Sequence, residues 1–318
     1  MDAFRYKLEE EHVTLGFWEI LWRGFAMGVA ELVPGISGGT VAFITNIYRE
    51  LISSLASFNF SSFKNLLRPR LFWQRHNLRF LLPLGLGMFV AVLFLANLIQ
   101  YSLIHFRPAV WSLFLAVMIV ALNKIVKEVQ ITRHIPILLG GIILGMGSLW
   151  LVPAENSTAT DMMIFFGGAL AISAWILPGI SGSYILLVLG LYPTIIGAIA
   201  SFELSTLTIF SLGCVFGIFF FVRAVDWAYT KHADRFISFV VGFMLMSLVR
   251  LWPWQAEHPD GVGSGLGLLG PNQYEALTGQ SPYLSVVLVF AFLGTGSLWL
   301  INRRTVSYTH LRAHETIA

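Results

Sequence analysis

Long apolar segments with almost no charge dominate the chain and restrict it to a membrane fold. Only 12% of the 318 residues are Asp, Glu, Lys or Arg, whereas a soluble domain carries about 25%. Most of the apolar runs are long enough to cross about 30 Å of hydrocarbon as a helix, and a β-barrel would show alternating segments of about ten residues instead. The pattern predicts an all-α polytopic membrane protein with apolar runs at 13–33, 41–57, 80–104, 109–124, 135–152, 162–177, 184–200, 206–222, 236–252 and 283–301.

One helix-breaking phrase occurs twice within these runs. LVPGISGGTVAFITNIY covers residues 32–48, ILPGISGSYILLVLGLY covers residues 176–192, and each has a Tyr fourteen residues after its Pro. Pro and Gly both destabilise a helix interior, and no polar loop separates the segments on either side of each phrase. Each phrase therefore predicts a re-entrant helical hairpin, one over 13–57 and one over 162–200.

Loop charges predict the side of the membrane on which each loop lies, because cytoplasmic loops are enriched in Lys and Arg. Lys and Arg occur in the loops 58–79, 124–134 and 223–235 and again beyond 301, and they are missing from 153–161, 201–205 and 253–282. This alternation predicts that both termini are cytoplasmic. It is satisfied whether each hairpin is re-entrant or crosses the membrane fully.

Three spans follow each hairpin, and because three is odd the second half is expected to be inserted upside down relative to the first. This is the plan of inverted-repeat transporters, in which interrupted helices at equivalent positions mark the substrate site. Gly24 and Gly168, each ten residues before its Pro, extend the match between the halves. The predicted organisation is a cytoplasmic lead-in at 1–12, a first repeat at 13–152, an outer linker at 153–161, a second repeat at 162–301 and a cytoplasmic tail at 302–318. The stretch TVSYTHLRAHETIA in that tail fits no part of the repeat and has the character of foreign sequence from cloning or read assembly.

Both phrases have the composition of an anion-binding site. Gly allows conformations that turn successive backbone N–H groups toward one point, and the helix after each phrase carries partial positive charge at its N-terminus, where phosphate binds. Two such sites in inverted halves are expected to face one another near the membrane midplane. The competing interpretation is that Pro and Gly only permit a kink and close helix packing. The predicted substrate-binding residues are Arg23, Glu31, Pro34, Gly35, Ser37, Gly38, Gly39 and Thr40 in the first half and Pro178, Gly179, Ser181, Gly182 and Ser183 in the second.

Few charged residues interrupt the apolar runs, and an intramembrane charge points to function because it is costly. Glu31 lies three residues before Pro34, at the position that Trp175 holds in the second half, and is a candidate for proton coupling. Arg23 lies eight residues before Glu31. Three roles are open for its side chain: it binds a phosphate, it pairs with Glu31, or it extends toward the cytoplasm. Arg250, near the outer end of its run, either attracts an anionic headgroup or, the interpretation we favour, anchors the helix at the interface. The sequence contains no metal-ligand constellation, and its basic residues sit in short loops, so neither a cofactor nor a nucleic-acid partner is predicted.

The phrases ELVPGISGGT and ILPGISGSY, together in one chain of about this length, resemble a bacterial and archaeal family long called domain of unknown function 368 and associated with polyprenyl-phosphate transport. The match covers residues 13–301 and rests on both phrases, the acidic residue before the first and the Tyr after each. The resemblance implies a transporter in the bacterial cytoplasmic membrane that returns undecaprenyl phosphate, the lipid carrier of cell-wall synthesis, across the bilayer. A proton or a sodium gradient is the expected driving force, and no feature of the sequence determines the oligomeric state.

Two other functions share part of this pattern. Undecaprenyl-pyrophosphate phosphatases carry a similar Pro-Gly-x-Ser phrase followed by Arg, but Gly38 and Gly182 stand at that position here, and the clustered glutamates of those enzymes are missing. Without a cationic clamp, phosphoryl transfer loses its main stabilisation, so no enzymatic activity is expected. The other alternative is a small-anion channel or exchanger, because chloride channels also use paired half-helix N-termini. A lipid transporter needs a lateral opening to the bilayer and a channel needs a continuous aqueous path, and the sequence distinguishes neither.

Overall fold

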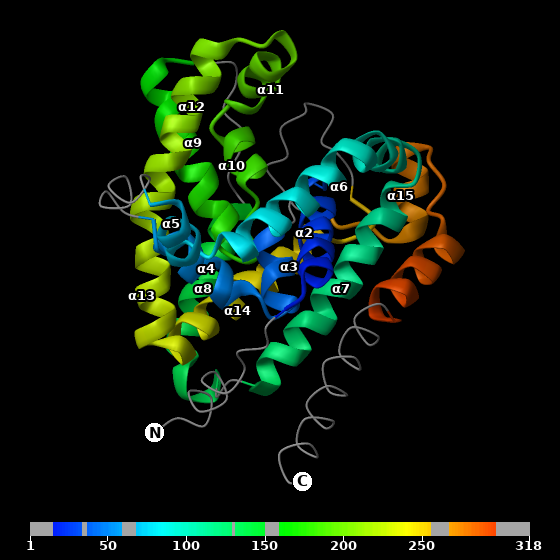
Figure 1. The fold of residues 1–318 in the computed structure, drawn as a ribbon. Coiled ribbons are helices and arrows are strands. Elements are labelled where there is room, and N and C mark those ends of the chain that lie inside the picture. The colour runs from blue at the N-terminus through cyan, green and yellow to red at the C-terminus, as the bar shows by residue number, and fades with distance from the viewer. Residues whose placement is uncertain are drawn as a thin grey trace.

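The computed structural model is all-helical over the part of the chain that it describes (Figure 1). The described residues are 15–33, 37–58, 68–128, 131–149, 159–255 and 267–296. Within these ranges β-type pairing is limited to one isolated bridge between Gln255 and Leu268. The predicted all-α class is therefore confirmed.

The first half contains several short helices between longer ones. Its elements are α2 (Phe17–Glu31), α3 (Gly38–Ile44), α4 (Tyr48–Ala56), α5 (Pro69–Arg75), α6 (Leu78–His105), α7 (Arg107–Glu128), the 3-10 helix η2 (Ile131–His134) and α8 (Ile135–Leu149). The second half opens in the same order, with α9 (Asp161–Ile176), α10 (Gly182–Val188) and α11 (Tyr192–Ser201). It continues with α12 (Leu204–Gly217), the π-helix η3 (Ile218–Val222), α13 (Arg223–Lys231), α14 (Ala233–Arg250), α15 (Pro271–Thr278) and a last apolar helix, Leu284–Gly296.

Membrane-spanning helices are present, as the apolar runs predict. Two described helices are long and apolar enough to cross a bilayer, α6 and the continuous run Leu204–Lys231 that joins α12, η3 and α13. The pair α10 and α11 passes the same test as one bent segment, with 116° between its two parts. Shorter apolar helices occur at Arg107–Asn123, Ile135–Leu149, Asp161–Ile176 and Leu284–Gly296. The described residues thus contain two or three candidate membrane spans, which fits a polytopic membrane protein.

Three segments differ from the predicted runs and loops. The run 41–57 is divided between α3 and α4, and the run 184–200 between α10 and α11. The breaks fall at Asn46 and Gly190, whose φ angles are 60° and 69°, and a left-handed residue of this kind ends a helix. The predicted loop 223–235 is instead helical as far as Lys231, because α13 continues the apolar helix in front of it.

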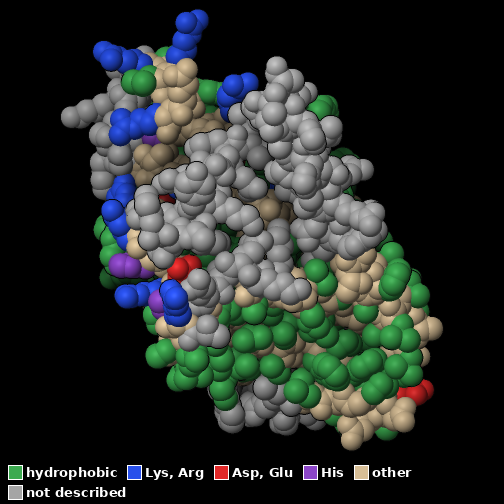
Figure 2. Space-filling view, turned by 90° about the horizontal axis from the view of Figure 1, so that it is seen from below, with side chains coloured by type: hydrophobic (Ala, Val, Ile, Leu, Met, Phe, Trp, Pro, Cys, Tyr) green, Lys and Arg blue, Asp and Glu red, His purple; other side chains and the backbone are tan. Residues whose placement is uncertain are grey.

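The outer surface of the spans is apolar, as contact with lipid requires. On α6 the side chains of Leu82, Phe89 and Phe94 are 52%, 62% and 72% exposed. Figure 2 shows a broad field of hydrophobic side chains over one part of the molecule and Lys and Arg side chains gathered toward another. Such exposure would cause aggregation in water, so this surface is the one that faces the bilayer.

Glycines bring the helices of each half into close contact. A Cβ atom on Gly24 of α2 would lie 2.0 Å from the Leu84 carbonyl oxygen of α6, and one on Gly213 of α12 would lie 1.9 Å from the Phe165 carbonyl oxygen of α9. Only Gly permits this approach, which is how helices associate tightly in lipid. The packing of α2 on α6 in the first half therefore has a counterpart in that of α9 on α12 in the second.

The two halves are also joined to each other. Helix α8 of the first half packs on α14 of the second, and α7 contacts the last helix through a 3.2 Å hydrogen bond from Ser112 Oγ to the Val287 carbonyl. A single buried core includes Met27 and Ile52 from the first half and Ile176 and Met244 from the second. Helix α3 contributes Ala42 to this shared core, whereas Leu186 of α10 lies in a second cluster with Leu191 and Ile195.

Candidate functional site

The two phrases begin their short helices in the same way. Ser37 and Ser181 are the N-cap residues of α3 and α10, and both have extended backbone angles. Ser37 Oγ accepts a 3.1 Å hydrogen bond from Gly39 N, whereas Ser181 Oγ lies 2.8 Å from the hydroxyl oxygen of Ser183. Both N-cap residues are buried, at 0% and 3% exposure. A short helix therefore begins next to each phrase, at Gly38 and at Gly182.

The phrases touch one another. The hydroxyl of Thr40 in α3 accepts a 2.8 Å hydrogen bond from the backbone N–H of Gly179, in the turn before α10. Ser37 Oγ donates to the Trp175 carbonyl oxygen at 2.9 Å, so the N-terminus of α3 lies against the C-terminus of α9. A Cβ atom on Gly39 would lie 2.7 Å from that same oxygen. The contact between the halves therefore depends on small and hydroxyl-bearing residues of the first phrase.

Glu31 occupies the N-terminus of α3. Its Oε1 atom accepts a hydrogen bond from Gly38 N, and the Trp175 side chain hydrogen-bonds the same carboxylate. Glu31 and Trp175 hold equivalent positions before the two Pro residues, so the two residues matched by sequence are in direct contact. The backbone N–H predicted to bind an anion already donates to a carboxyl oxygen of the protein itself.

Arg23 is not brought to this point. Its Nε donates to the Thr45 carbonyl oxygen at 3.3 Å, and its Nη1 donates to the Glu19 carbonyl oxygen at 3.2 Å. Thr45 is the C-cap of α3, and a helix of this length separates its two ends by about 10 Å. The guanidinium therefore neutralises the negative end of α3, and the structure separates it from Gly38 and Glu31.

The remaining residues of the second phrase are held by α9 and α14. Gly179 has a φ angle of 90°, and its carbonyl oxygen accepts a 2.8 Å hydrogen bond from Ser247 Oγ of α14. Pro178 is buried, and a Cβ atom on Gly182 would lie 2.6 Å from the Ala171 carbonyl oxygen. Pro34 and Gly35 of the first phrase lie outside the described residues.

Arg250, predicted to anchor its helix at the membrane interface, lies close to the second phrase. The guanidinium carbon of Arg250 lies 3.6 Å from the centre of the Tyr184 ring, and Tyr184 directly follows Ser183. Sequence reasoning treated Arg250 as an interfacial anchor because it lies at the end of an apolar run. The presence of Arg250 within an apolar run indicates a functional role for this residue. The sequence alone does not show that the end of this run lies beside α10.

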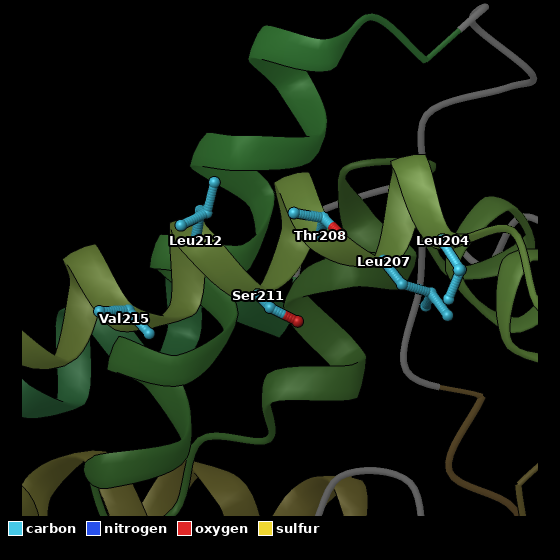
Figure 3. A pocket seen from close by; sticks show the side chains of 6 residues that line it. All are labelled: Leu204, Leu207, Thr208, Ser211, Leu212 and Val215. Atoms are coloured by element: carbon cyan, nitrogen blue, oxygen red, sulfur yellow. The ribbon is translucent and has the colours of Figure 1, made fainter.

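An open pocket of about 270 Å³ lies elsewhere, on the exposed face of α12 (Figure 3). It is lined by Leu204, Leu207, Thr208, Ser211, Leu212 and Val215. No residue of either phrase contributes to it. Within the described part of the chain, no group of three or more His, Cys, Asp or Glu side chains is arranged to hold a metal ion.

The all-helical fold, the apolar spans and the match to a family model define the class of the protein: a multi-pass membrane transporter. More narrowly, the chain belongs to the VCA0040-like family, described as undecaprenyl phosphate translocase-like, whose model matches residues 27–262. It is 34% identical over 291 residues to a polyprenyl-phosphate transporter of Vibrio cholerae, covering 87% of this chain and 94% of the relative. It is 30% identical over 257 residues to a polyprenyl-phosphate transporter of Staphylococcus aureus, covering 74% of this chain and 86% of the relative. No solved structure is detectably similar to it.

Proposed function

We propose that this chain carries undecaprenyl phosphate across the bacterial cytoplasmic membrane, so that the lipid carrier is reused in cell-envelope synthesis. Membership of the family and the names of both relatives support transport of a polyprenyl phosphate. The observation that carries the proposal is the hydrogen bond between Thr40 of one phrase and Gly179 of the other. Because of it, hydroxyl and N–H groups from both halves lie together in the core.

In the proposed cycle the phosphate headgroup replaces the Glu31 carboxylate at the N-terminus of α3. Gly38 N already donates to a carboxylate oxygen, so this position accepts an anionic oxygen with the right approach. Two anions at one N–H repel each other, and the phosphate therefore binds when Glu31 is protonated or has moved aside. This exchange couples the lipid to a proton gradient, and a sodium ion that neutralises Glu31 would couple it to a sodium gradient.

The proposal includes an inverted repeat of two halves, 13–152 and 162–301, joined by an outer linker at 153–161. The equivalent packing of α2 on α6 and of α9 on α12 supports it. The third helix of each half lies on the second helix of the other, α8 on α14 and the last helix on α7, as a two-fold relation requires. In this arrangement α2–α4 and α9–α11 are re-entrant hairpins, the lead-in at 1–12 and the tail at 302–318 are cytoplasmic, and transport proceeds by rocking one half against the other.

We propose a transporter rather than a phosphatase. Gly38 and Gly182 follow the Ser of each phrase where the phosphatases carry Arg. Within the described residues the donors at the first phrase are backbone N–H and hydroxyl groups, which hold a phosphate but provide no cationic clamp for its transfer.

The experiment is a leaflet-exchange assay with purified protein in liposomes. A fluorescent polyprenyl phosphate is placed in both leaflets, and a membrane-impermeant quencher reports the fraction that reaches the outer leaflet. The wild-type protein is expected to make all of the lipid accessible, and Glu31→Gln is expected to lose the dependence of this rate on the proton gradient. Ser37→Ala and Ser181→Ala are expected to slow it. A wild-type protein that moves no lipid but dissipates a chloride gradient would instead support the channel or exchanger, and release of phosphate from the pyrophosphate carrier would support the enzyme.

A further inference from the structure

Arg250 is a half-buried cation that has no acidic partner among the described residues. It closes α14, in an apolar run of the chain. Its described hydrogen bonds go from Nη2 to the Ser148 carbonyl oxygen and from the guanidinium to the Tyr184 side chain, neither of which is a carboxylate. By contrast, the half-buried Arg23 has the negative charges of Glu19 and Glu50 close by. A guanidinium at membrane depth without a counter-ion is costly, so a site of this kind is completed by an anion.

The Arg250 guanidinium is held in a fixed plane. It stacks on the Tyr184 ring at 3.6 Å, and the Tyr184 hydroxyl donates at 2.9 Å to the same Ser148 oxygen that Arg250 contacts. Three helices, α8, α10 and α14, thus fix its orientation. A guanidinium has five N–H donors, and its hydrogen bonds to the Ser148 carbonyl and the Tyr184 side chain leave others for a ligand.

This cation lies beside the second phrase. Tyr184 is three residues after Ser181 in α10, which puts both on the same side of the helix, one turn apart. The hydroxyls of Ser181 and Ser183 contact one another at 2.8 Å. A planar cation from α14, stacked on Tyr184, and two hydroxyls at the start of α10 provide the donors that a phosphate monoester prefers.

We propose that Arg250, oriented by Tyr184, binds the phosphate monoester of the transported lipid at the second phrase. The inference rests on the proposed function and extends it by identifying the residue that neutralises the headgroup. Because the loop charges predict that α14 ends at the outer surface, Arg250 receives the phosphate from the outer leaflet. The two planar N–H donors of the fork, rather than positive charge alone, hold the phosphate oxygens.

The test measures binding in lipid nanodiscs by wild-type protein, Arg250→Gln and Arg250→Lys. Arg223→Gln is the matched control, since Arg223 also lies over a ring, that of Phe219 at 5.6 Å, but is exposed. Each protein is titrated with a polyprenyl monophosphate, with the corresponding uncharged prenol and with inorganic phosphate. Loss of a charge-assisted pair of hydrogen bonds is expected to weaken binding of the lipid phosphate about tenfold or more in Arg250→Gln. Arg250→Lys is expected to bind about threefold to tenfold more weakly, and Arg223→Gln to stay within about twofold.

The outcomes separate this site from the proposed function. If wild-type protein moves lipid phosphate between leaflets and both Arg250 variants bind it as tightly as wild type, the assignment of Arg250 is wrong and the transport function stands. If Arg250→Gln does not fold, Arg250→Lys decides: unchanged affinity overturns the proposal, and weaker affinity supports it. If inorganic phosphate binds as tightly as the lipid and Arg250→Gln loses both, the anion site is supported and the lipid as its ligand is rejected. Equal binding of the prenol and its phosphate overturns the site.

Discussion

Replacing Thr40 by Val tests the contact that joins the two phrases. Val keeps the shape of Thr but has no hydroxyl, so Gly179 N loses the acceptor that it contacts at 2.8 Å. Thr40 is only 2% exposed, and water cannot replace the lost oxygen without opening the core. A buried N–H left without an acceptor costs about 1–3 kcal/mol. The variant is therefore expected to be destabilised by that amount.

The assay is unfolding of purified protein in mixed micelles with increasing SDS, followed by circular dichroism. The matched control is Thr208→Val, the same change at an exposed position of α12, where an effect within about 0.5 kcal/mol is expected. Equal midpoints for Thr40→Val and Thr208→Val would refute the reasoning, because the Thr40 hydroxyl would then contribute nothing to the contact between the halves.

Three further changes test other parts of the structure. Glu31→Gln retains an oxygen that accepts from Gly38 N and is expected to stay within about 1 kcal/mol of wild type, while Glu31→Ala leaves buried donors unpaired and costs about 1–3 kcal/mol more; the same SDS titration measures both. Gly39→Ala forces a Cβ atom to 2.7 Å from a backbone oxygen of α9 and is expected to lower the folded yield sharply, whereas Gly140→Ala, with nothing within 4 Å, is expected to fold normally. Burial and a neighbouring positive charge lower the pKa of His76, between α5 and α6. Its contribution to stability is therefore complete above about pH 6.5 and is lost as the pH falls below that value, so the melting temperature of His76→Gln is expected to fall less between pH 7 and pH 5 than that of wild type.

Local chemistry explains why part of the core was predictable. The short helices begin at Gly38 and Gly182, directly after a Ser, because Ser is among the residues most favoured at a helix N-cap. Asn46 and Gly190 also carry a readable signal, since both residue types adopt the left-handed conformation that divides the runs. The breaks were not predicted because hydropathy alone does not distinguish a turn within an apolar run from a continuous helix.

Contacts between distant segments were not predictable in the same way. Spacing along α2 brings Arg23 within two turns of Glu31, but its partner is Thr45, because α3 and the turn after it fold back along α2. Similarly, nothing local to Arg250 indicates that it stacks on Tyr184. In both cases the partner is set by packing between helices, which one sequence does not specify.

The most direct test of the account is the headgroup selectivity of leaflet exchange. Liposomes containing the wild-type protein are loaded in parallel with a labelled polyprenyl monophosphate and with the same labelled prenol without phosphate, and the rate at which each becomes accessible to an external quencher is measured. We expect rapid, protein-dependent exchange of the monophosphate, little exchange of the prenol, and slower exchange of the monophosphate in Arg250→Gln. Equal rates for the two lipids, or a monophosphate rate no greater than that of empty liposomes, would contradict transport through a phosphate-binding core.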